Sequence, residues 1–147
     1  MGEVCHFVDF FQFLTGSAPV EVYARATGNI SNCLTACVRF SDGSTGSITY
    51  VSSGDSSLPK ERCEAFGGGR AAVLDDFRSL TLHTGGRRRR RTALSQDKGH
   101  RAELAAFFDS VRRGIPAPLS LESALLTTRA TFAIETSLAT GRPAPVE

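Results

Sequence analysis

The stretch CLTACVRFSDGSTGSITYVS, residues 33–52, alternates apolar and polar residues on both sides of an Asp-Gly pair. Such alternation is typical of strands that have one buried face. Asp42 and Gly43 tolerate the positive φ angles that tight hairpins require. The stretch therefore predicts two antiparallel strands, at residues 33–40 and 47–52, joined by residues 41–46.

Further strands are predicted on both sides of this hairpin. The segment VEVYARAT, residues 20–27, alternates in the same way. Beyond the hairpin, strand-like segments lie at residues 61–66, 71–75, 79–84 and 88–94, with glycines at 67–69 and 85–86 between them. Because the connections are too short for crossover helices, the strands are expected to form a mostly antiparallel meander.

Helices are predicted at the two ends of the chain. Residues 3–14 have a wide apolar face at helical spacing, and Gly16 and Pro19 stop this helix. Residues 98–113 carry an apolar stripe, and Ser120 is a good N-cap for a helix that ends near Gly141. We therefore predict an α+β fold: a mostly antiparallel open β-sheet with helices packed on one face.

Length and composition point to one domain over residues 1–147. Seventeen basic and 15 acidic residues give a net charge of +2, which is too even to indicate a polyanion partner by itself. No stretch approaches the roughly 20 apolar residues of a membrane span, and no export signal is visible, so a cytoplasmic protein is expected. The cysteines form no recognisable metal-binding pattern with one another or with histidines. We therefore expect no metal site and four reduced thiols, at Cys5, Cys33, Cys37 and Cys63.

The first helix carries candidate catalytic residues. His6 and Asp9 are neighbours on its surface, and Glu3 lies one turn earlier. A histidine beside carboxylates suits proton transfer near neutral pH. The alternative is that these residues form the solvent edge of an amphipathic helix. This helix is strongly apolar and begins within the first few residues. We therefore also expect that the sequence begins inside a larger protein.

Several motifs together resemble one enzyme family. They are the segments at residues 2–9 (GEVCHFVD), 14–16 (LTG), 59–62 (PKER), 74–78 (LDDFR), 97–100 (DKGH) and 140–143 (TGRP). In this order they are similar to the C-terminal domain of the glucose-fructose oxidoreductase and inositol dehydrogenase (Gfo/Idh/MocA) family, over nearly the whole chain. The resemblance implies a dihydrodipicolinate-reductase-like α+β domain whose open sheet face builds homo-oligomers.

The resemblance also implies a function. Family members join this domain to an N-terminal Rossmann domain that binds NAD or NADP, and they oxidise a hydroxyl of a sugar, polyol or related substrate. His6 matches the histidine that takes the hydroxyl proton, whereas the assisting lysine comes from the Rossmann domain. The chain alone is therefore expected to be catalytically incomplete and to bind no cofactor by itself.

Two acidic residues near His6, Glu3 and Asp9, are candidates for contacting the substrate. Many family members have an aspartate four residues before the histidine, where this chain has Gly2. Glu3 is the substitute candidate for contacting substrate. Asp9 matches the motif, and either substrate binding or a hydrogen bond that anchors the helix would explain it.

A nucleotide site is not expected in this sequence. The dinucleotide fingerprint needs its glycines directly between a strand and a helix. The run Gly67-Gly68-Gly69 instead lies between two strand-like segments, and no phosphate loop of the G-x-x-x-x-G-K type is present. The glycine run therefore predicts a turn.

Basic residues provide the remaining candidates. Arg87–Arg91 could bind a polyanion, although a solvated edge strand explains them better, because alternation divides the run between two faces and no aromatic residues are interleaved. Lys98 and His100, at a helix start, are candidates for binding an anionic group of the substrate, or are ordinary helix-start residues. Two alternatives to the enzyme domain therefore stay open: a non-catalytic oligomerisation or binding module, and a polyanion-binding domain.

Overall fold

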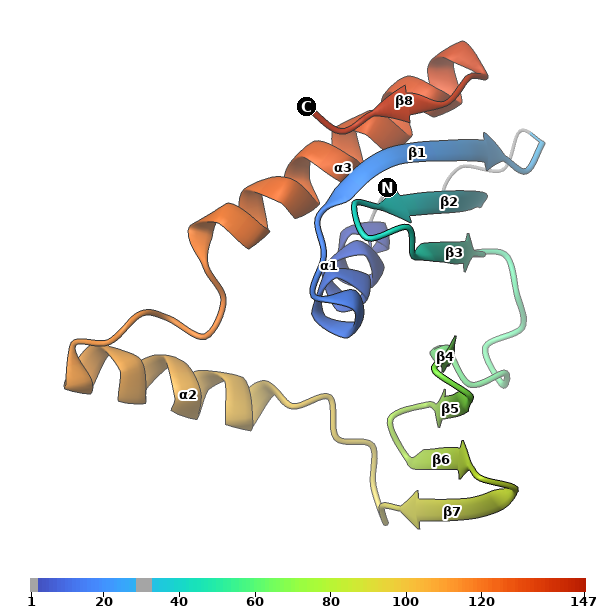
Figure 1. Ribbon diagram of the computed structural model, residues 1–147. Coiled ribbons are helices and arrows are strands. Elements are labelled where there is room, and N and C mark those ends of the chain that lie inside the picture. The colour runs from blue at the N-terminus through green and yellow to red at the C-terminus, as the bar shows by residue number, and fades with distance from the viewer. Residues whose placement is uncertain (1–2, 29–32) are drawn as a thin grey trace. The chain divides into compact units, whose positions relative to one another are not determined.

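The computed structural model describes residues 3–28 and 33–147, which fall into two compact units (Figure 1). One unit comprises the residues up to Ser53 together with Pro116–Glu147, and the other is Gly54–Ile115. Each unit contains a four-stranded sheet in which every pairing is antiparallel. The predicted α+β class and the antiparallel pairing are confirmed, with the strands divided between two sheets.

The sheet of the first unit is built on the predicted hairpin. Its strand order is β3-β2-β1-β8, with β1 at Pro19–Ala26, β2 at Leu34–Phe40, β3 at Thr45–Tyr50 and β8 at Ala144–Pro145. Every second residue of β2 is buried, as its alternation predicts. Between β2 and β3, the Gly43 N–H donates to the Phe40 carbonyl at 3.0 Å, which closes the turn.

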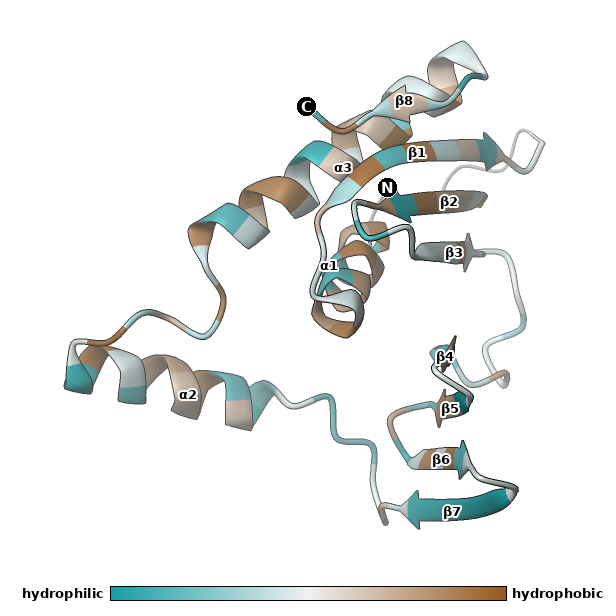
Figure 2. Cartoon of the chain, in the orientation of Figure 1, coloured by the Kyte–Doolittle hydropathy of each residue, from teal (hydrophilic) through white to brown (hydrophobic). Residues whose placement is uncertain are grey.

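Two helices supply the rest of this unit's core. They are α1, Val4–Thr15, and α3, Leu121–Thr140. Ser120 accepts a hydrogen bond from the Ser123 N–H at 3.1 Å and so caps α3 as predicted. Both helices carry apolar residues, coloured brown in Figure 2, and these pack with apolar residues of the strands. The fully buried members of this core are Val4, Val8, Val22, Ala24, Ala36, Val38, Ala130 and Ile134.

The second unit is a meander followed by a helix. Its strands are β4 at Arg62–Gly67, β5 at Arg70–Asp75, β6 at Ser79–Thr84 and β7 at Arg87–Thr92, paired in chain order. The turns Gly68-Gly69 and Gly85-Gly86 have positive φ at both residues, which is the geometry of a two-residue hairpin with a type I′ turn. The predicted turn at the glycine run is confirmed.

The helix of the second unit is α2, His100–Arg113. Its predicted apolar stripe is present, yet the four residues are between 48% and 63% exposed. Only Ser110 of this helix is buried. The stripe comprises Leu104, Phe107, Phe108 and Val111.

Two differences from the prediction concern the sheet of the first unit. The short strand β8 was not predicted, because it is only two residues long and follows closely on Gly141, where the last helix was expected to end. It is held by the Val146 N–H, which donates to the Val20 carbonyl at 3.0 Å. Strand β3 begins two residues earlier than predicted, where Thr45 pairs with Arg39.

Among the described residues, no helix is both long and apolar enough to cross a bilayer.

Candidate functional site

Helix α1 has one buried face and one exposed face. Val4 and Val8 are fully buried, whereas His6 is exposed and Phe13 is 78% exposed. His6 and Phe13 are seven residues apart, so they lie on the same side of the helix. Within residues 3–28 and 33–147, no hydrogen bond to the His6 imidazole is found. The imidazole is therefore available to a ligand from outside the first unit.

Two polar residues connect the same helix to α3. Gln12, which is 8% exposed, donates from Nε2 to the Thr127 hydroxyl at 2.6 Å. Thr127 in turn donates to Asp9 Oδ1 at 3.5 Å. Hydrogen bonds between polar side chains of two packed helices fix the rotation of one helix against the other. Because His6 is on the same helix, this link sets the direction in which its side chain faces.

The Asp9 contact bears on its predicted role. A hydrogen bond from Thr127 is the helix-anchoring interaction that the sequence left open for this residue. Its role in substrate binding stays a prediction. Gln12 and Thr127 were not predicted as site residues. The available signal was a polar residue at every third position of the first helix, at His6, Asp9 and Gln12.

Glu3 occupies the N-cap position of α1 and is partly buried. Its side chain makes no capping hydrogen bond to the helix, and its predicted substrate contact stays a prediction. Gly2, which stands where the resemblance implies an aspartate, lies outside the described residues.

A second cluster of charged residues lies in the other unit. Lys98 Nζ is 2.5 Å from Glu61 Oε1 and 6.0 Å from the centre of the Phe77 ring. Glu61 is only 9% exposed, and its second oxygen, Oε2, is buried without a hydrogen-bond partner among the described residues. The Asp76 N–H donates to the Glu61 carbonyl at 2.7 Å, and this bond ties the turn at Asp76 and Phe77 to the cluster.

This turn is strained. Asp76 and Phe77 have φ angles of 49° and 50°, a left-handed conformation that non-glycine residues seldom adopt. Gln96 Nε2 stabilises the turn by donating to the Asp76 carboxylate at 2.9 Å and to its carbonyl at 3.2 Å. The turn thus carries the Phe77 ring, whose centre lies 6.0 Å from Lys98 Nζ.

The cluster qualifies the predictions for Lys98 and His100. The Lys98 ammonium is paired with a buried carboxylate, so its charge is already largely neutralised within the unit. His100 is the first residue of α2 and is exposed. Substrate binding by both residues stays a prediction. Glu61 was missed, because a single acidic residue at the start of a strand carries no signal of burial.

The predicted site residues belong to different units. Glu3, His6 and Asp9 lie in the first unit, and Lys98 and His100 lie in the second. The contacts described above bring Asp9 to Gln12 and Thr127, and Lys98 to Glu61 and Phe77.

The glycine run does not fit a dinucleotide. Gly67 ends β4, Arg70 begins β5, and the two residues are paired across the turn. No helix follows this turn, so the helix N-terminus that would receive a pyrophosphate is missing there. The described residues also contain no group of three or more His, Cys, Asp or Glu side chains placed to hold a metal ion.

One cysteine has unusual acidity. The Ser52 and Ser53 hydroxyls lie 3.5 Å and 3.6 Å from Cys33 Sγ. The Ser52 hydroxyl first, and then that of Ser53, lower the pKa of Cys33 to about 7, although burial opposes the shift. By contrast, burial raises the pKa of Cys63. The four thiols are not joined in disulfides.

No protein-family model and no curated protein matches this sequence. Solved structures do match it. The aldose-aldose oxidoreductase from Caulobacter crescentus, complexed with glycerol, superposes with a TM-score of 0.79 over 96% of this chain and 45% of its own, at 19% identity. An oxidoreductase from Agrobacterium radiobacter in complex with NAD+, L-tartaric acid and magnesium superposes with a TM-score of 0.80. The match covers 97% of this chain and 47% of the oxidoreductase, at 16% sequence identity.

A third match extends the comparison to a nucleotide-sugar enzyme. The UDP-N-acetylglucosamine 3-dehydrogenase from Acidithiobacillus ferrooxidans superposes with a TM-score of 0.74 over 91% of this chain and 45% of its own, at 19% identity. The chain thus spans less than half the length of each of these three structures. The resemblance inferred from the motifs is confirmed at the level of the fold: this chain has the fold of one domain of such oxidoreductases.

Proposed function

We propose that this chain is the substrate-binding domain of an NAD(P)-dependent oxidoreductase that acts on a hydroxyl of a sugar, polyol or related compound. The observation that carries the proposal is the placement of His6. It lies exposed on a helix whose opposite face is fixed in the core, within a fold shared with oxidoreductase domains. We further propose that both units act together as one domain, the C-terminal domain of a longer enzyme.

In this proposal His6 handles the proton. A neutral imidazole accepts the hydroxyl proton through a ring nitrogen as the hydroxyl becomes a carbonyl, and proton transfer of this kind contributes about 10²–10⁴-fold to a rate. The link of Gln12 to Thr127 keeps the imidazole directed outward. Asp9, Glu3, Lys98 and His100 are proposed to contact the substrate.

The nicotinamide cofactor would accept the hydride. Since the glycine turn of this chain does not fit a dinucleotide, we assign NAD(P) binding to a Rossmann domain outside these residues. The isolated chain is therefore expected to bind neither NAD nor NADP and to have no turnover.

The test uses the full-length gene product that contains a Rossmann domain, or this chain combined with a separately expressed one. NAD(P)H formation is followed with a panel of sugars and polyols. His6→Ala should lower kcat by about 10²-fold or more, whereas His83→Ala, at an exposed position of β6, should leave it unchanged. Both variants must keep the wild-type unfolding midpoint. Equal turnover of His6→Ala and wild type would eliminate the proton-transfer role.

A second candidate function is assembly, because the second unit exposes apolar side chains. Phe66 is 76% exposed on β4, and α2 exposes its apolar stripe. We propose a homo-oligomer that forms through a sheet face. Light scattering across a wide concentration range should show a mass above that of the monomer, and Phe66→Ser should shift it toward monomer. A wild-type protein that stays monomeric throughout would exclude this assembly.

A further inference from the structure

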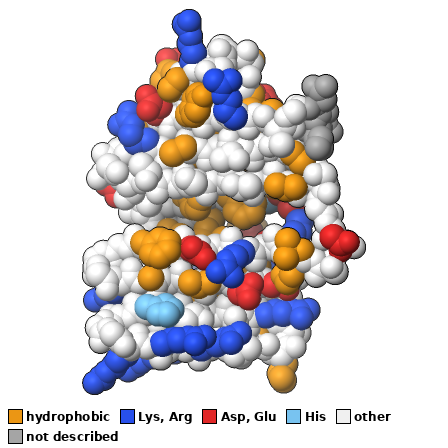
Figure 3. All heavy atoms as spheres, turned by 90° about the vertical axis from the view of Figure 1, so that its right-hand side faces the viewer, with side chains coloured by type: hydrophobic (Ala, Val, Ile, Leu, Met, Phe, Trp, Pro, Cys, Tyr) orange, Lys and Arg blue, Asp and Glu red, His pale blue; other side chains and the backbone are white. Residues whose placement is uncertain are grey.

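Strand β7 consists almost entirely of arginine. Its residues Arg87–Thr92 include five consecutive arginines, and all six positions are exposed. The sheet order β4-β5-β6-β7 places this strand at an edge. Figure 2 shows the whole strand as hydrophilic, and Figure 3 shows Lys and Arg side chains in a row over it. An edge strand also presents main-chain N–H and C=O groups that have no partner within its sheet.

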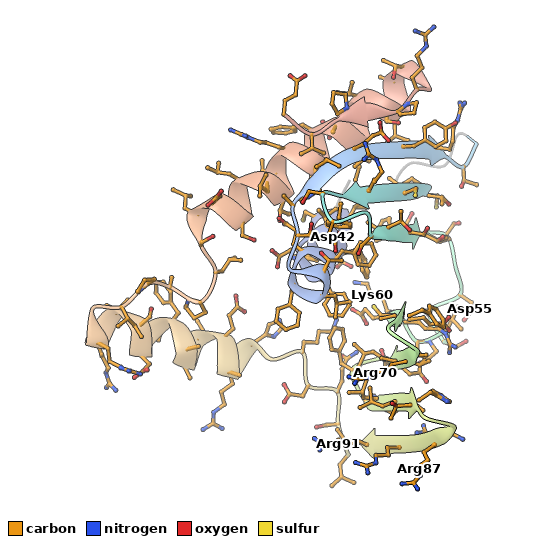
Figure 4. The ribbon with its side chains drawn as sticks, viewed as in Figure 1. Asp42, Asp55, Lys60, Arg70, Arg87 and Arg91 are labelled. Atoms are coloured by element: carbon orange, nitrogen blue, oxygen red, sulfur yellow. The ribbon has the colours of Figure 1, made fainter. Side chains whose placement is uncertain are left out.

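The register sorts these arginines into two rows. Arg87, Arg89 and Arg91 share one face of the sheet, and Figure 4 marks the first and last of them at the two ends of β7. Arg70 extends this row across the sheet, because both Arg70 and Arg87 pair with Thr84. Arg88 and Arg90 occupy the opposite face. Neighbours within a row are about 6.6–6.8 Å apart along the strand.

The charge of the first row is not neutralised within the chain. Among the described residues, no carboxylate lies within ion-pair distance of Arg87, Arg89 or Arg91. On the opposite face, Arg90 donates to the Ser79 hydroxyl at 3.3 Å. Four acidic residues of the second unit pair with other cations: Glu64 with Arg62, Asp76 with Arg78, Glu61 with Lys98, and Asp109 with Arg113. Adjacent like charges repel, so a partner of opposite charge would relieve the strand.

We propose that β7 is a docking edge for an extended acidic segment of a partner protein, which adds to the sheet as a further strand. A strand with acidic residues at alternate positions has the same side-chain period as Arg87, Arg89 and Arg91, so its carboxylates fall opposite the guanidinium groups. Its main chain pairs with the free edge at the same time. This recognition is independent of the proposed oxidoreductase function.

The other occupants fit less well. A second copy of β7 would place arginine opposite arginine, which is destabilising. Single-stranded nucleic acid needs aromatic side chains on which its bases can stack. On the face of Arg87, Arg89 and Arg91, the neighbouring strand β6 instead presents Leu80, Leu82 and Thr84.

The proposal can be tested with a fluorescent peptide of about ten residues that alternates Glu and Thr, titrated against the full chain at low ionic strength. Binding is expected to weaken as salt is added. Replacing Arg87, Arg89 and Arg91 together by Gln should weaken it about tenfold or more. The matched control replaces three exposed arginines of α2 by Gln, Arg101, Arg112 and Arg113. It makes the same change of charge and should alter binding less than twofold.

A second readout separates strand addition from simple charge attraction. Hydrogen exchange of the β7 amides should slow when the peptide is bound, and the amides of β4, at the other edge of the sheet, should be unaffected. Oligo-thymidine and a Lys-Thr peptide serve as competing probes. Three results would each overturn the proposal: equal binding by both triple variants, unchanged exchange in β7 at saturating peptide, or tighter binding of oligo-thymidine than of the Glu-Thr peptide.

Discussion

The Ser137 hydroxyl, on α3, accepts a hydrogen bond of 2.9 Å from the main-chain N–H of Ala24, on β1. The short strand β8 pairs with β1 only at Glu21 and Val22, so it does not reach Ala24. Ser137 is fully buried, and its own proton goes to the Arg142 carbonyl at 2.6 Å. One side chain thus completes the edge of β1 and fixes the turn that leads into β8.

Removing this hydroxyl should destabilise the first unit. Ser137→Ala leaves the buried Ala24 N–H and the Arg142 carbonyl without their partner, at a cost of about 1–3 kcal/mol. Urea unfolding measures the loss. Thr136→Ala is the matched control, because its exposed hydroxyl donates to the Phe132 carbonyl of the same helix, and it should change the free energy of unfolding by less than about 0.5 kcal/mol. Equal effects of the two variants would show that the Ser137 bridge does not stabilise the fold.

Close contact between α1 and β3 gives a second prediction. The ring of Phe11 lies against Gly46, where any Cβ atom would collide with it, and the same ring meets Phe40 edge to face at 6.5 Å. Gly46→Ala should therefore cost about 1–3 kcal/mol. Gly67→Ala is the control, because a Cβ atom at that strand position meets nothing within 4 Å.

A double-mutant cycle tests the cause of this loss. If the Phe11 ring is responsible, Gly46→Ala should cost less in a Phe11→Ala background than in the wild type. The same cost in both backgrounds would instead locate the strain in the β3 main chain.

Local patterns predicted most of the fold because neighbouring residues determine it. Alternation located the strands, and Asp42-Gly43 and the two glycine pairs located the hairpin turns. The strand β8 escaped prediction because two residues carry no period. The division of the strands between two sheets depends on pairing between distant segments, and single-sequence alternation does not report it.

The candidate site was predictable only in part. His6 was found through a motif, and its exposure follows from the apolar residues on the opposite side of the same helix. The partners that hold the site are distant in sequence: Thr127 lies 115 residues from Gln12, and Lys98 lies 37 residues from Glu61. Such pairs arise from tertiary packing, which no local pattern records.

The acidity of Cys33 gives a prediction about pH. Its pKa is lowered to about 7 in the folded protein, whereas an unfolded thiol titrates near roughly 8.5. Between these values the unfolded state binds more protons, so stability rises with pH. This contribution is fully present above the unfolded pKa and is lost as the pH falls through about 7.

Unfolding in urea at a series of pH values checks this dependence. Cys33→Ser should reduce the rise in stability between neutral and mildly alkaline pH. Cys37→Ser, at an exposed position of β2, should leave the rise intact. A pH profile for Cys33→Ser that parallels the wild type would contradict the assignment.

The last prediction concerns Glu61 and Lys98. Lys98→Met leaves the carboxylate of Glu61 buried without its counter-ion, and Oε2 of that carboxylate already has no partner. Breaking a buried pair by removing one partner costs about 3–5 kcal/mol. Because the Lys98 side chain is 33% exposed, solvent screens part of the interaction, and we expect about 1–3 kcal/mol.

Removing both charges should reverse the loss. In Glu61→Leu with Lys98→Met, no ion remains to be desolvated, so the double variant should be more stable than Lys98→Met alone. Arg113→Gln is the control, since it breaks an exposed pair with Asp109 and should cost at most about 0.5 kcal/mol. If the losses of Glu61→Leu and Lys98→Met measured separately simply add up to the loss of the double variant, Glu61 and Lys98 are not coupled.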